Sequence, residues 1–301
     1  MIMTNQDKIK TLRSKIEEAD VIIVGAASGM SAASGFEFYY KDDEVFRSIA
    51  RGLADKYGLT SSFAAYYDKR VTREEWWAMN IRFIKYIYEC YTGETYKDLY
   101  ELLHGKEYYI VTTNQDAQFY RLFPENRITR LQGDWRYFQC SRRCHDQIYY
   151  NRDIVNNLYD KIVDDKLPDS LIPRCPKCGA DMEPWVRGPK FLQGKFYDAE
   201  LKRYLDYLGN CTSKKTLFLE LGVGMMTPMF IKEPFMNMTF QWPDAFYATI
   251  NPQHAIIPKE IADKSIAIDD DILKVLKELL GKPTDSIRQF DKNNVFDPSK
   301  I

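Results

Sequence analysis

Short apolar runs that end in glycine or polar residues recur along this chain. The first is Val21-Ile-Ile-Val24, which leads into Gly25. Comparable runs lie at residues 107–113, 128–132, 215–224, 245–251 and 264–268. Because a continuous apolar run of this length is typical of a strand buried on both faces, these segments predict a parallel sheet.

Segments with helical spacing of apolar residues separate these runs. They cover residues 1–18, much of 45–105, residues 197–208, and a stretch that starts at Asp269 and ends near Gly281. In the second of these segments we interpret four aromatic residues as core residues rather than as the lining of a ligand groove: Trp76, Trp77, Phe83 and Tyr86. Strands that alternate with helices predict the α/β class with a doubly wound parallel sheet.

Two insertions interrupt the alternation and predict a second, smaller lobe. One is the helical segment 45–105, and the other is a cysteine-containing module at 138–184. The main, Rossmann-like nucleotide-binding domain is predicted to consist of residues 1–44, 106–137 and 185–281. The remaining residues, 282–301, are predicted to be a polar tail.

In a doubly wound sheet, ligands bind outside the carboxyl ends of the strands. This rule places small and polar residues along one rim of the predicted sheet, at 25–35, 112–116, Gln132, 222–224 and Asn251. The first of these segments joins a strand to a helix through glycine, alanine and serine, which is typical of a loop that binds a nucleotide. The sequence therefore predicts a nucleotide site at this rim.

Four of the six cysteines form two close pairs, Cys140 with Cys144 and Cys175 with Cys178. Four thiolates satisfy tetrahedral zinc and leave no open position, so these spacings predict a structural zinc site. His145, which follows Cys144, is an alternative ligand, and a redox-active cysteine pair is an alternative use. The other two cysteines, Cys90 and Cys211, are predicted to be unreactive buried thiols.

Charge and hydropathy exclude two classes of partner. The formal net charge of -1 gives no basic field that attracts nucleic acid. No apolar run approaches the roughly 20 residues that span a bilayer. The segment from Met1 to Lys15 is polar, of mixed charge, and lacks the apolar core of a signal peptide. We therefore expect a cytoplasmic protein that binds neither nucleic acid nor membranes.

Taken in order along residues 20–281, the motifs resemble those of the sirtuin family. The segment from Ala27 to Gly35 is similar to the family's first NAD loop, and Thr112-Thr-Asn-Gln-Asp116 is similar to its Thr-Gln-Asn-x-Asp motif. Gln132-Gly133 stands where the family has a His-Gly pair, and the cysteine module follows it. Later family motifs are matched by Gly222-Val-Gly224, Ile250-Asn251 and Asp269-Asp270. The resemblance implies a sirtuin fold that uses NAD and Zn²⁺.

The resemblance also implies roles for individual residues. It makes Asn114, Asp116 and Gln132 catalytic: the first holds the ribose or an ordered water, the second binds the carboxamide, and the third orients the nicotinamide ribose. The implied NAD-binding residues are Ala27, Ser28, Gly29, Met30, Ser31, Gly35, Thr112, Asn114, Gln115, Asp116, Gln132, Gly222, Val223, Gly224, Asn251, Asp269 and Asp270. Among them, Ser31 is assigned to the pyrophosphate, Asn251 to the adenosine ribose, and the two aspartates to adenine.

Two departures from the family pattern point away from lysine deacetylation. The histidine that acts as general base in standard sirtuins is Gln132 here, and an amide has no protonation equilibrium near neutral pH. None of the three histidines, His104, His145 and His254, lies in a motif that replaces it. The Phe-Gly-Glu stretch that lines the family's acyl-lysine tunnel is replaced by Trp185-Val-Arg-Gly-Pro-Lys-Phe191.

Gln132-Gly-Asp-Trp135 and Gln139-Cys-Ser-Arg-Arg-Cys-His145 resemble the macrodomain-linked (class M) bacterial branch of the family. That resemblance implies a protein mono-ADP-ribosyltransferase whose target is a lipoyl-carrier protein related to the glycine cleavage H protein. It also implies a macrodomain hydrolase as functional partner. Two interpretations of the loop Arg187–Lys190 stay open: it admits the acceptor or its acidic neighbours, or it is only a solvated loop.

Two other functions stay open at this point. One is an NAD-dependent deacylase, or an NAD hydrolase with water as the acceptor. The other is a non-catalytic sensor of NAD or ADP-ribose that uses the zinc lobe to contact a partner. The presence of Asn114 disfavours the sensor, because a protein that only binds the nucleotide does not need it.

Overall fold

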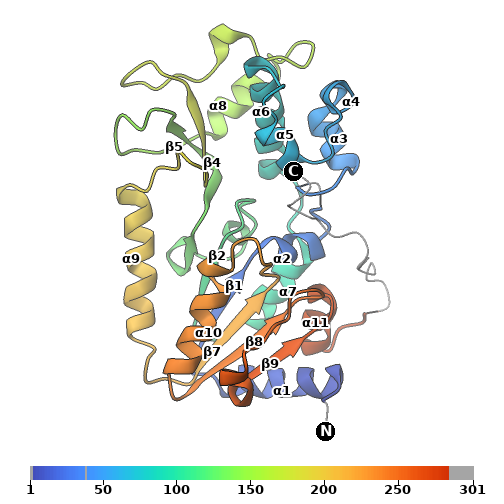
Figure 1. Cartoon of the computed structure of the whole chain (residues 1–301), viewed down its shortest axis with the longest axis vertical. Helices are drawn as coiled ribbons and strands as arrows, with labels where there is room; N and C mark the ends of the chain where they lie inside the picture. The colour runs from blue at the N-terminus through green and yellow to red at the C-terminus, as the bar shows by residue number, and fades with distance from the viewer. Residues whose placement is uncertain (1–2, 38, 285–301) are drawn as a thin grey trace.

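The computed structural model of the protein describes residues 3–37 and 39–284 and shows two lobes stacked along the long axis of the molecule (Figure 1). The large lobe holds a parallel sheet with helices on both faces. The small lobe holds helices, a three-stranded antiparallel sheet and the cysteine module. The predicted α/β class and doubly wound sheet are thereby confirmed.

The large sheet has the strand order β3-β2-β1-β7-β8-β9, and every neighbouring pair is parallel. Its strands are β1 (Val21–Ala26), β2 (Tyr108–Thr112), β3 (Ile128–Arg130), β7 (Thr216–Leu221), β8 (Ala245–Ile250) and β9 (Ser265–Ile268). Every residue of β1 is buried, which explains why this segment is an uninterrupted apolar run.

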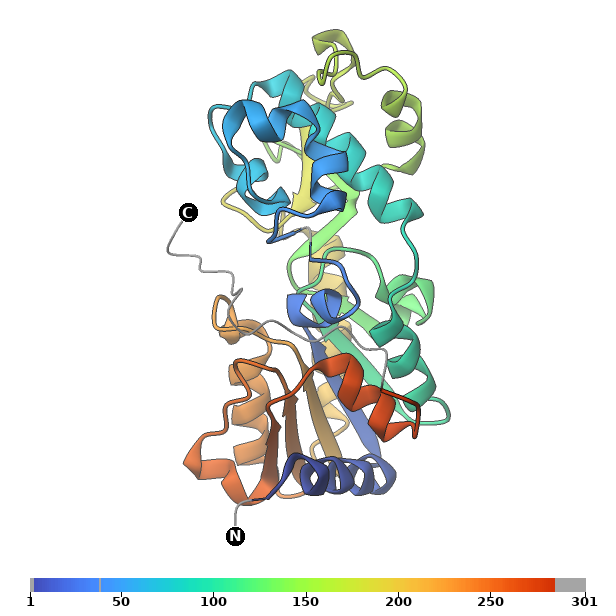
Figure 2. The same ribbon diagram turned by 90° about the vertical axis from the view of Figure 1, so that its right-hand side faces the viewer.

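Helices cover both faces of this sheet (Figure 2). One face packs against α1 (Asn5–Glu18), α7 (Glu94–Leu102) and α11 (Ile272–Leu279). The other face packs against α9 (Lys195–Gly209) and α10 (Lys232–Gln241). The helix α1 begins at a capping box that Thr4 forms, and its buried residues recur at helical spacing: Ile9, Leu12 and Ile16.

The small lobe is built around a second apolar core. Its helices are α3 (Glu44–Ala50), α4 (Gly52–Tyr57), α5 (Ser62–Tyr67), α6 (Arg73–Glu89) and α8 (Arg152–Tyr159). Its sheet has the order β5-β4-β6, with β4 (Gly133–Cys140), β5 (Tyr149–Tyr150) and β6 (Met182–Val186). Of the aromatic residues predicted in a core, Trp77 and Phe83 are buried here, and Trp76 and Tyr86 are partly buried against them.

Shorter elements complete the connections. The helix α2 (Ser28–Ala33) follows β1 directly at the rim of the large sheet. The 3₁₀ helices are η1 (Phe119–Arg121), η2 (Glu125–Arg127), η3 (Asp169–Leu171), η4 (Pro228–Phe230) and η5 (Lys259–Lys264). In the part of the chain that the structure covers, no helix is both long enough and apolar enough to cross a bilayer.

The two lobes divide the chain somewhat differently from the predicted segments. The segment 45–105 contributes to both lobes, because α3–α6 form the small lobe whereas α7 buries Tyr96 and Leu99 against the large sheet. The strands β4 and β6 each run across a predicted boundary. The predicted tail, 282–301, lies outside the described residues from position 285 onward.

Candidate active site

A cleft of about 790 Å³ runs along the carboxyl ends of the parallel strands and is closed from above by residues of the small lobe. This volume lies in the range of cofactor and substrate sites. Eleven of the predicted site residues line it: Ala27, Ser28, Gly29, Ser31, Asn114, Gln115, Asp116, Gln132, Gly222, Gly224 and Asn251. Strands far apart in the sequence thus bring these residues to one place.

The turn from β1 into α2 meets the turn that follows β7 without side chains between them. The backbone N–H of Gly29 donates to the carbonyl of Gly222 over 3.2 Å. A Cβ atom on Gly29 would lie 2.7 Å from the Cα of Gly222, and one on Gly222 would lie 2.6 Å from the Cα of Gly29. Gly222 also has φ +69°. Glycine is therefore required on both sides of this contact.

The loop that follows β2 carries Asn114 and Asp116 into the cleft. Thr112 holds this loop, because its Oγ1 donates to the carbonyl of Ala26 and accepts from the N–H of Asn114, both over 2.9 Å. The Asp116 carboxylate accepts from the Ser31 hydroxyl over 2.5 Å and from the N–H of Gln118 over 3.1 Å. Burial raises the pKa of Asp116, although these hydrogen bonds oppose the rise.

A residue that the sequence motifs did not indicate touches all three of these polar groups. The Tyr96 hydroxyl, on α7, lies 2.8 Å from Ser31 Oγ, 3.1 Å from Asn114 Nδ2 and 3.4 Å from Asp116 Oδ2. Its side chain is fully buried. Burial, followed by the charge of Asp116, raises its pKa well above the usual value, so the hydroxyl stays neutral. No local pattern marks Tyr96, because it belongs to an amphipathic helix remote from the rim motifs.

Gln132 stands at the end of the short strand β3 with its main chain fixed from two sides. Its carbonyl accepts from Gln115 Nε2 over 2.7 Å and from the N–H of Arg187 over 2.9 Å. The next residue, Gly133, has φ +82° and would place a Cβ atom 2.1 Å from the carbonyl oxygen of Trp185. The turn after Gln132 thus needs glycine, and Gln132 itself is one of the residues that line the cleft.

Arg187 lines the cleft but is already engaged in its wall. Its guanidinium donates to the carbonyl of Leu131 over 2.8 Å and to the Tyr197 hydroxyl over 3.1 Å. The same group lies over the rings of Phe191 and Phe230. Lys190, at the other end of the loop Arg187–Lys190, does not line the cleft. The contacts of Arg187 therefore support the backbone beside Gln132.

Asn251 ties together the turns that follow β7 and β8. Its Nδ2 donates to the carbonyl of Val223, and its Oδ1 accepts from the N–H groups of Gln253 and His254, each over 3.0 Å. One Nδ2 hydrogen is left for a ligand. His254 lines the same end of the cleft, where burial and then the charge of Lys232 lower its pKa.

Six predicted binding residues do not line the cleft: Met30, Gly35, Thr112, Val223, Asp269 and Asp270. Met30 and Val223 are buried in the core on opposite faces of the sheet. Asp270 pairs with Lys274 over 2.7 Å, and Asp269 is exposed. The cleft instead meets Asp271 and Ile272, because α11 begins three residues later than expected and Asp271 is its N-cap.

The small-lobe side of the cleft is aromatic, which the sequence did not indicate. It includes Tyr39, Tyr66, Phe83 and Trp135, so Phe83 is both a core residue and a cleft residue. Trp135 packs edge-on against Phe83 and Tyr66, with ring centroids 4.7 and 5.3 Å away. These residues come from the loop after α2, from α5, from α6 and from β4, so no single motif contains them.

The four paired cysteines come together in the small lobe. Their Sγ atoms all lie within 4.8 Å of one another, and those of Cys140 and Cys178, and of Cys144 and Cys175, are 3.6 Å apart. Tetrahedral zinc with Zn–S bonds of the usual length separates its sulfurs by about 3.8 Å. The Nε2 of His145 bonds to the Tyr149 hydroxyl over 2.7 Å. The group is therefore compatible with a closed four-cysteine zinc site.

Comparison with known proteins gives two curated relatives, although no protein-family model matches the chain. The chain is 34% identical over 298 residues to a protein ADP-ribosyltransferase from Staphylococcus aureus, a match that covers 97% of this chain and 92% of that protein. It is 28% identical over 241 residues to a probable bifunctional ADP-ribose hydrolase/ADP-ribosyltransferase from Fusarium oxysporum f. sp. cubense. That match covers 77% of this chain and 40% of the fungal protein.

Solved structures share the fold. A sirtuin solved to explain substrate affinity superposes with a TM-score of 0.59 at 16% identity, covering 90% of this chain and 98% of that one. A Sir2 homologue in complex with NAD superposes with a TM-score of 0.56 at 18% identity, covering 90% of this chain and 92% of that one. The chain thus has the sirtuin fold and is related in sequence to the Staphylococcus aureus protein along almost its entire length. It belongs to the sirtuin-fold family of protein ADP-ribosyltransferases.

Proposed function

We propose that the protein transfers ADP-ribose from NAD to a side chain of a lipoyl-carrier protein related to the glycine cleavage H protein, and that it releases nicotinamide. A macrodomain hydrolase is the proposed functional partner that removes the modification. The name of the Staphylococcus aureus relative supports the transfer reaction, and the name of the fungal relative joins it to an ADP-ribose hydrolase. The choice of acceptor rests on the resemblance of the segments 132–135 and 139–145 to the class M branch.

The observation that carries the proposal is that Gln132, a residue with an amide side chain, lines the cleft. An amide neither takes up nor gives off a proton near neutral pH, so it cannot serve as a general base. Of the described residues that line the cleft, one is a histidine: His254, which follows β8. The strand β8 is four strands away from β3 in the sheet. At the usual strand spacing, the ends of these two strands are therefore roughly 19 Å apart along the rim. The described cleft lining therefore has no histidine beside Gln132, which favours an acceptor that needs no histidine base.

The residues of this chain position and shield the reacting groups. NAD supplies a glycosidic bond whose cleavage releases nicotinamide. Asn114 and Asp116 present polar atoms beside the glycine turn, and the aromatic wall restricts the access of water. A carboxylate or thiolate of the acceptor attacks the anomeric carbon as the bond to nicotinamide breaks, and the nicotinamide leaves with that bonding pair. Since such an acceptor is already ionised, no proton has to be removed.

The direct test is transfer of labelled ADP-ribose from NAD to a purified lipoyl-carrier protein and, in parallel, to a lysate of the source organism. We expect one labelled band in each, lost in Asn114→Ala and kept in Asn210→Ala, which removes a surface asparagine at the end of α9. Label on a different protein would keep the transferase and reject this acceptor. Steady nicotinamide release without label would indicate a hydrolase, and neither signal would indicate a sensor.

A further inference from the structure

The Tyr96 hydroxyl lies beneath the cleft, at the centre of a chain of hydrogen bonds between three predicted site residues. Tyr96 is 0% exposed, and its ring packs edge-on against Phe119 with the centroids 4.8 Å apart. The order of the chain in space is Asn114, Tyr96, Ser31 and Asp116, with separations of 3.1, 2.8 and 2.5 Å. The four residues come from three elements: α2, α7 and the loop after β2.

The direction of this chain follows from the hydrogens that are available. A carboxylate can only accept, so the single hydroxyl hydrogen of Ser31 points to Asp116. The single hydrogen of Tyr96 then points to Ser31 over 2.8 Å, with the Asp116 carboxylate as a second acceptor over 3.4 Å. Tyr96 has no hydrogen left for Asn114 and can only accept from it, which requires that Asn114 turns its Nδ2 toward Tyr96. Every hydrogen bond in the chain therefore points toward the Asp116 carboxylate, an arrangement in which successive bonds reinforce one another.

We propose that Tyr96 is a positioning residue for the reaction proposed above, because it transmits the orientation imposed by the Asp116 carboxylate to the amide of Asn114. With Nδ2 held by Tyr96, Asn114 presents its Oδ1 to the cleft as a hydrogen-bond acceptor for a hydroxyl group of the substrate or for a water. Thr112 fixes the backbone of the same residue. The backbone and the side chain of Asn114 are thus held from different elements.

The same hydrogen count predicts how the chain responds to protonation. If Asp116 takes up a proton, it becomes a donor to Ser31, each hydroxyl reverses, and Tyr96 donates to Asn114. The amide then has to rotate and present Nδ2 to the cleft instead of Oδ1. Burial raises the pKa of Asp116, so this reversal occurs at a higher pH than for an exposed aspartate, and the Oδ1-out orientation is present above that pKa and lost as the pH falls through it.

Other ionisable groups face Asp116 from the neighbouring elements. Asp134, on β4, adds to the rise of the Asp116 pKa, but its own charge is paired with Arg130 and Arg136 over 2.9 and 2.6 Å. Cys90, at the end of α6, is the other neighbour, and burial raises its pKa to about 11. Neither group changes its charge between pH 5 and 8, because Asp134 stays ionised and Cys90 stays protonated. A pH-dependent shift of the Asn114 amide signal in that range therefore does not arise from either of these two neighbours.

The test compares Tyr96→Phe with Tyr109→Phe, a matched control. Tyr109 is also buried, and its hydroxyl bonds to Thr129 Oγ1 and Arg203, but it does not line the cleft. In nicotinamide release from NAD by the full-length protein, we expect Tyr96→Phe to lower kcat by about 10- to 100-fold while KM for NAD changes by less than about 3-fold. Tyr109→Phe should keep the wild-type kcat. The double variant Tyr96→Phe/Asn114→Ala should be no slower than Asn114→Ala alone.

A second measurement does not depend on activity. In protein labelled with ¹⁵N in the asparagine side chains, the Asn114 amide signal should shift with pH in the wild type and in Tyr109→Phe, and should not titrate in Tyr96→Phe. Three outcomes would overturn the role of Tyr96. They are a wild-type kcat in Tyr96→Phe, additive effects in the double variant, and equal titration of the Asn114 amide in the wild type and in Tyr96→Phe. If the wild-type protein releases no nicotinamide, the proposed function is wrong. The titration of the Asn114 amide would still show whether Tyr96 links Asn114 to Asp116.

Discussion

At Gln132 and Leu131, the carbonyl groups accept hydrogen bonds from Gln115 and Arg187, which lie outside β3. These bonds hold the backbone independently of the side chain at position 132. A substitution of Gln132 is therefore expected to change the chemistry presented to the cleft without displacing the strand. This makes the position suitable for testing which reaction the site supports.

We expect Gln132→His not to give lysine deacetylation, although it restores the type of base that standard sirtuins use. The segment 185–191 replaces the tunnel motif. Within it, Arg187 lines the cleft and is held by the carbonyl of Leu131, and the buried Trp185 donates to the carbonyl of Leu192. The assay is the release of acetate-derived product from an acetyl-lysine peptide and NAD, with Gln132→Asn as control. If Gln132→His deacetylates the peptide, only the base was missing.

The contact between Gly29 and Gly222 predicts a steric defect. In Gly29→Ala, the new Cβ atom would lie 2.7 Å from a backbone atom that cannot rotate away, so we expect a loss of about 1–3 kcal/mol of stability and much weaker NAD binding. Gly209→Ala is the control, because it meets nothing within 4 Å and sits in the helix α9. It should be neutral or stabilising by up to about 1 kcal/mol. Denaturant unfolding and calorimetric titration with NAD distinguish the two.

The residues of the site differ in how well the sequence could indicate them. Asn114, Asp116 and Gln132 follow strands, and the rule that ligands bind at strand ends is enough to bring them to one rim. Tyr96 and Trp135 could not be found this way, because their place in the wall depends on how α7 and β4 pack. The shift from Asp270 to Asp271 at the cleft has a local cause, namely the choice of N-cap for α11.

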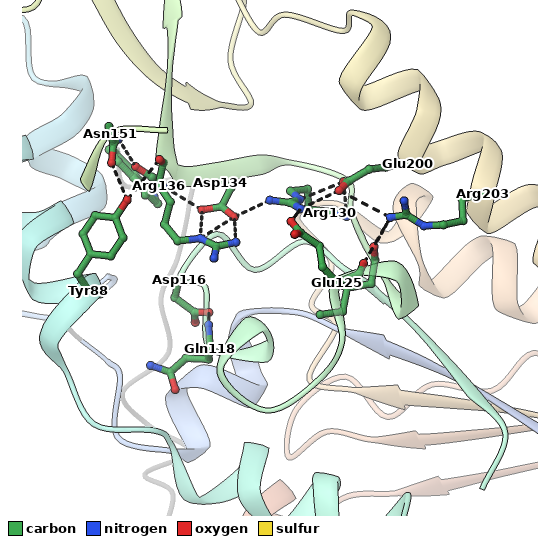
Figure 3. A network of polar contacts seen from close by, with 12 residues as sticks. Tyr88, Asp116, Gln118, Glu125, Arg130, Asp134, Arg136, Asn151, Glu200 and Arg203 are labelled. Carbon is green, nitrogen blue, oxygen red and sulfur yellow. Dashed lines mark hydrogen bonds and ion pairs between the residues drawn. The ribbon is translucent and has the colours of Figure 1, made fainter. Parts of the chain in front are cut away.

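Among the elements, β3, β4 and α9 are joined by a buried ionic network at the junction of the lobes (Figure 3). The Arg130 guanidinium donates to Glu200 over 2.7 Å and to Asp134 over 2.9 Å, and all three side chains are nearly fully buried. Burial raises the pKa of Asp134, but the guanidinium groups of Arg136 and Arg130 outweigh burial and hold that pKa below its usual value. The network fixes the start of β4 directly behind Gln132.

Arg130→Met should destabilise the protein by about 3–5 kcal/mol, since it leaves two buried carboxylates without their shared partner. Glu125→Gln removes the charge of another partner of the same guanidinium. Because the Glu125 side chain is 59% exposed, this variant should lose at most about 1 kcal/mol of stability. Urea unfolding of both variants provides the comparison. Equal effects would mean that burial does not control the strength of this network.

The cysteine module gives a second prediction for an element. Zinc should be present at one ion per chain, and Cys175→Ser or prolonged chelation should remove it and loosen the small lobe, because the four sulfurs join β4 to the turn before β6. Cys90→Ser should keep the metal, as Cys90 lies outside the cysteine group. Metal analysis by mass spectrometry and limited proteolysis check the outcome. Full zinc content in Cys175→Ser would contradict this ligand set.

The arrangement of elements was predictable to different degrees. Each strand of the large sheet is a short apolar run that ends in a turn, so the sheet and its α/β class follow from local pattern. The local pattern does not show to which lobe a helix belongs. The helix α7 has the same amphipathic pattern as its neighbours, yet it packs with α1 and α11 on the large sheet because its position follows the return of the chain from α6 to β2.

For the molecule as a whole, the cleft draws its walls from both lobes, so a bound nucleotide should stabilise the two together. At a concentration of NAD 100 times its Kd, we expect a gain of about 2.7 kcal/mol in the free energy of unfolding. In a thermal scan both lobes should shift upward, reported by Trp242 in the large lobe and Trp77 in the small one. A shift confined to one lobe would show that NAD contacts that lobe alone.

The pairing of β1 with β7 has a consequence for synthesis on the ribosome. The residues that meet across these strands are separated by 195 positions, as for Asp20 and Lys215 at their base. At usual translation rates the partner emerges roughly 10–40 s after β1 does. Throughout that interval the β7 side of β1 is unpaired, and by the end of it β2 and the whole small lobe have already emerged. The β7 side of β1 is therefore expected to be a long-lived binding site for chaperones on the nascent chain.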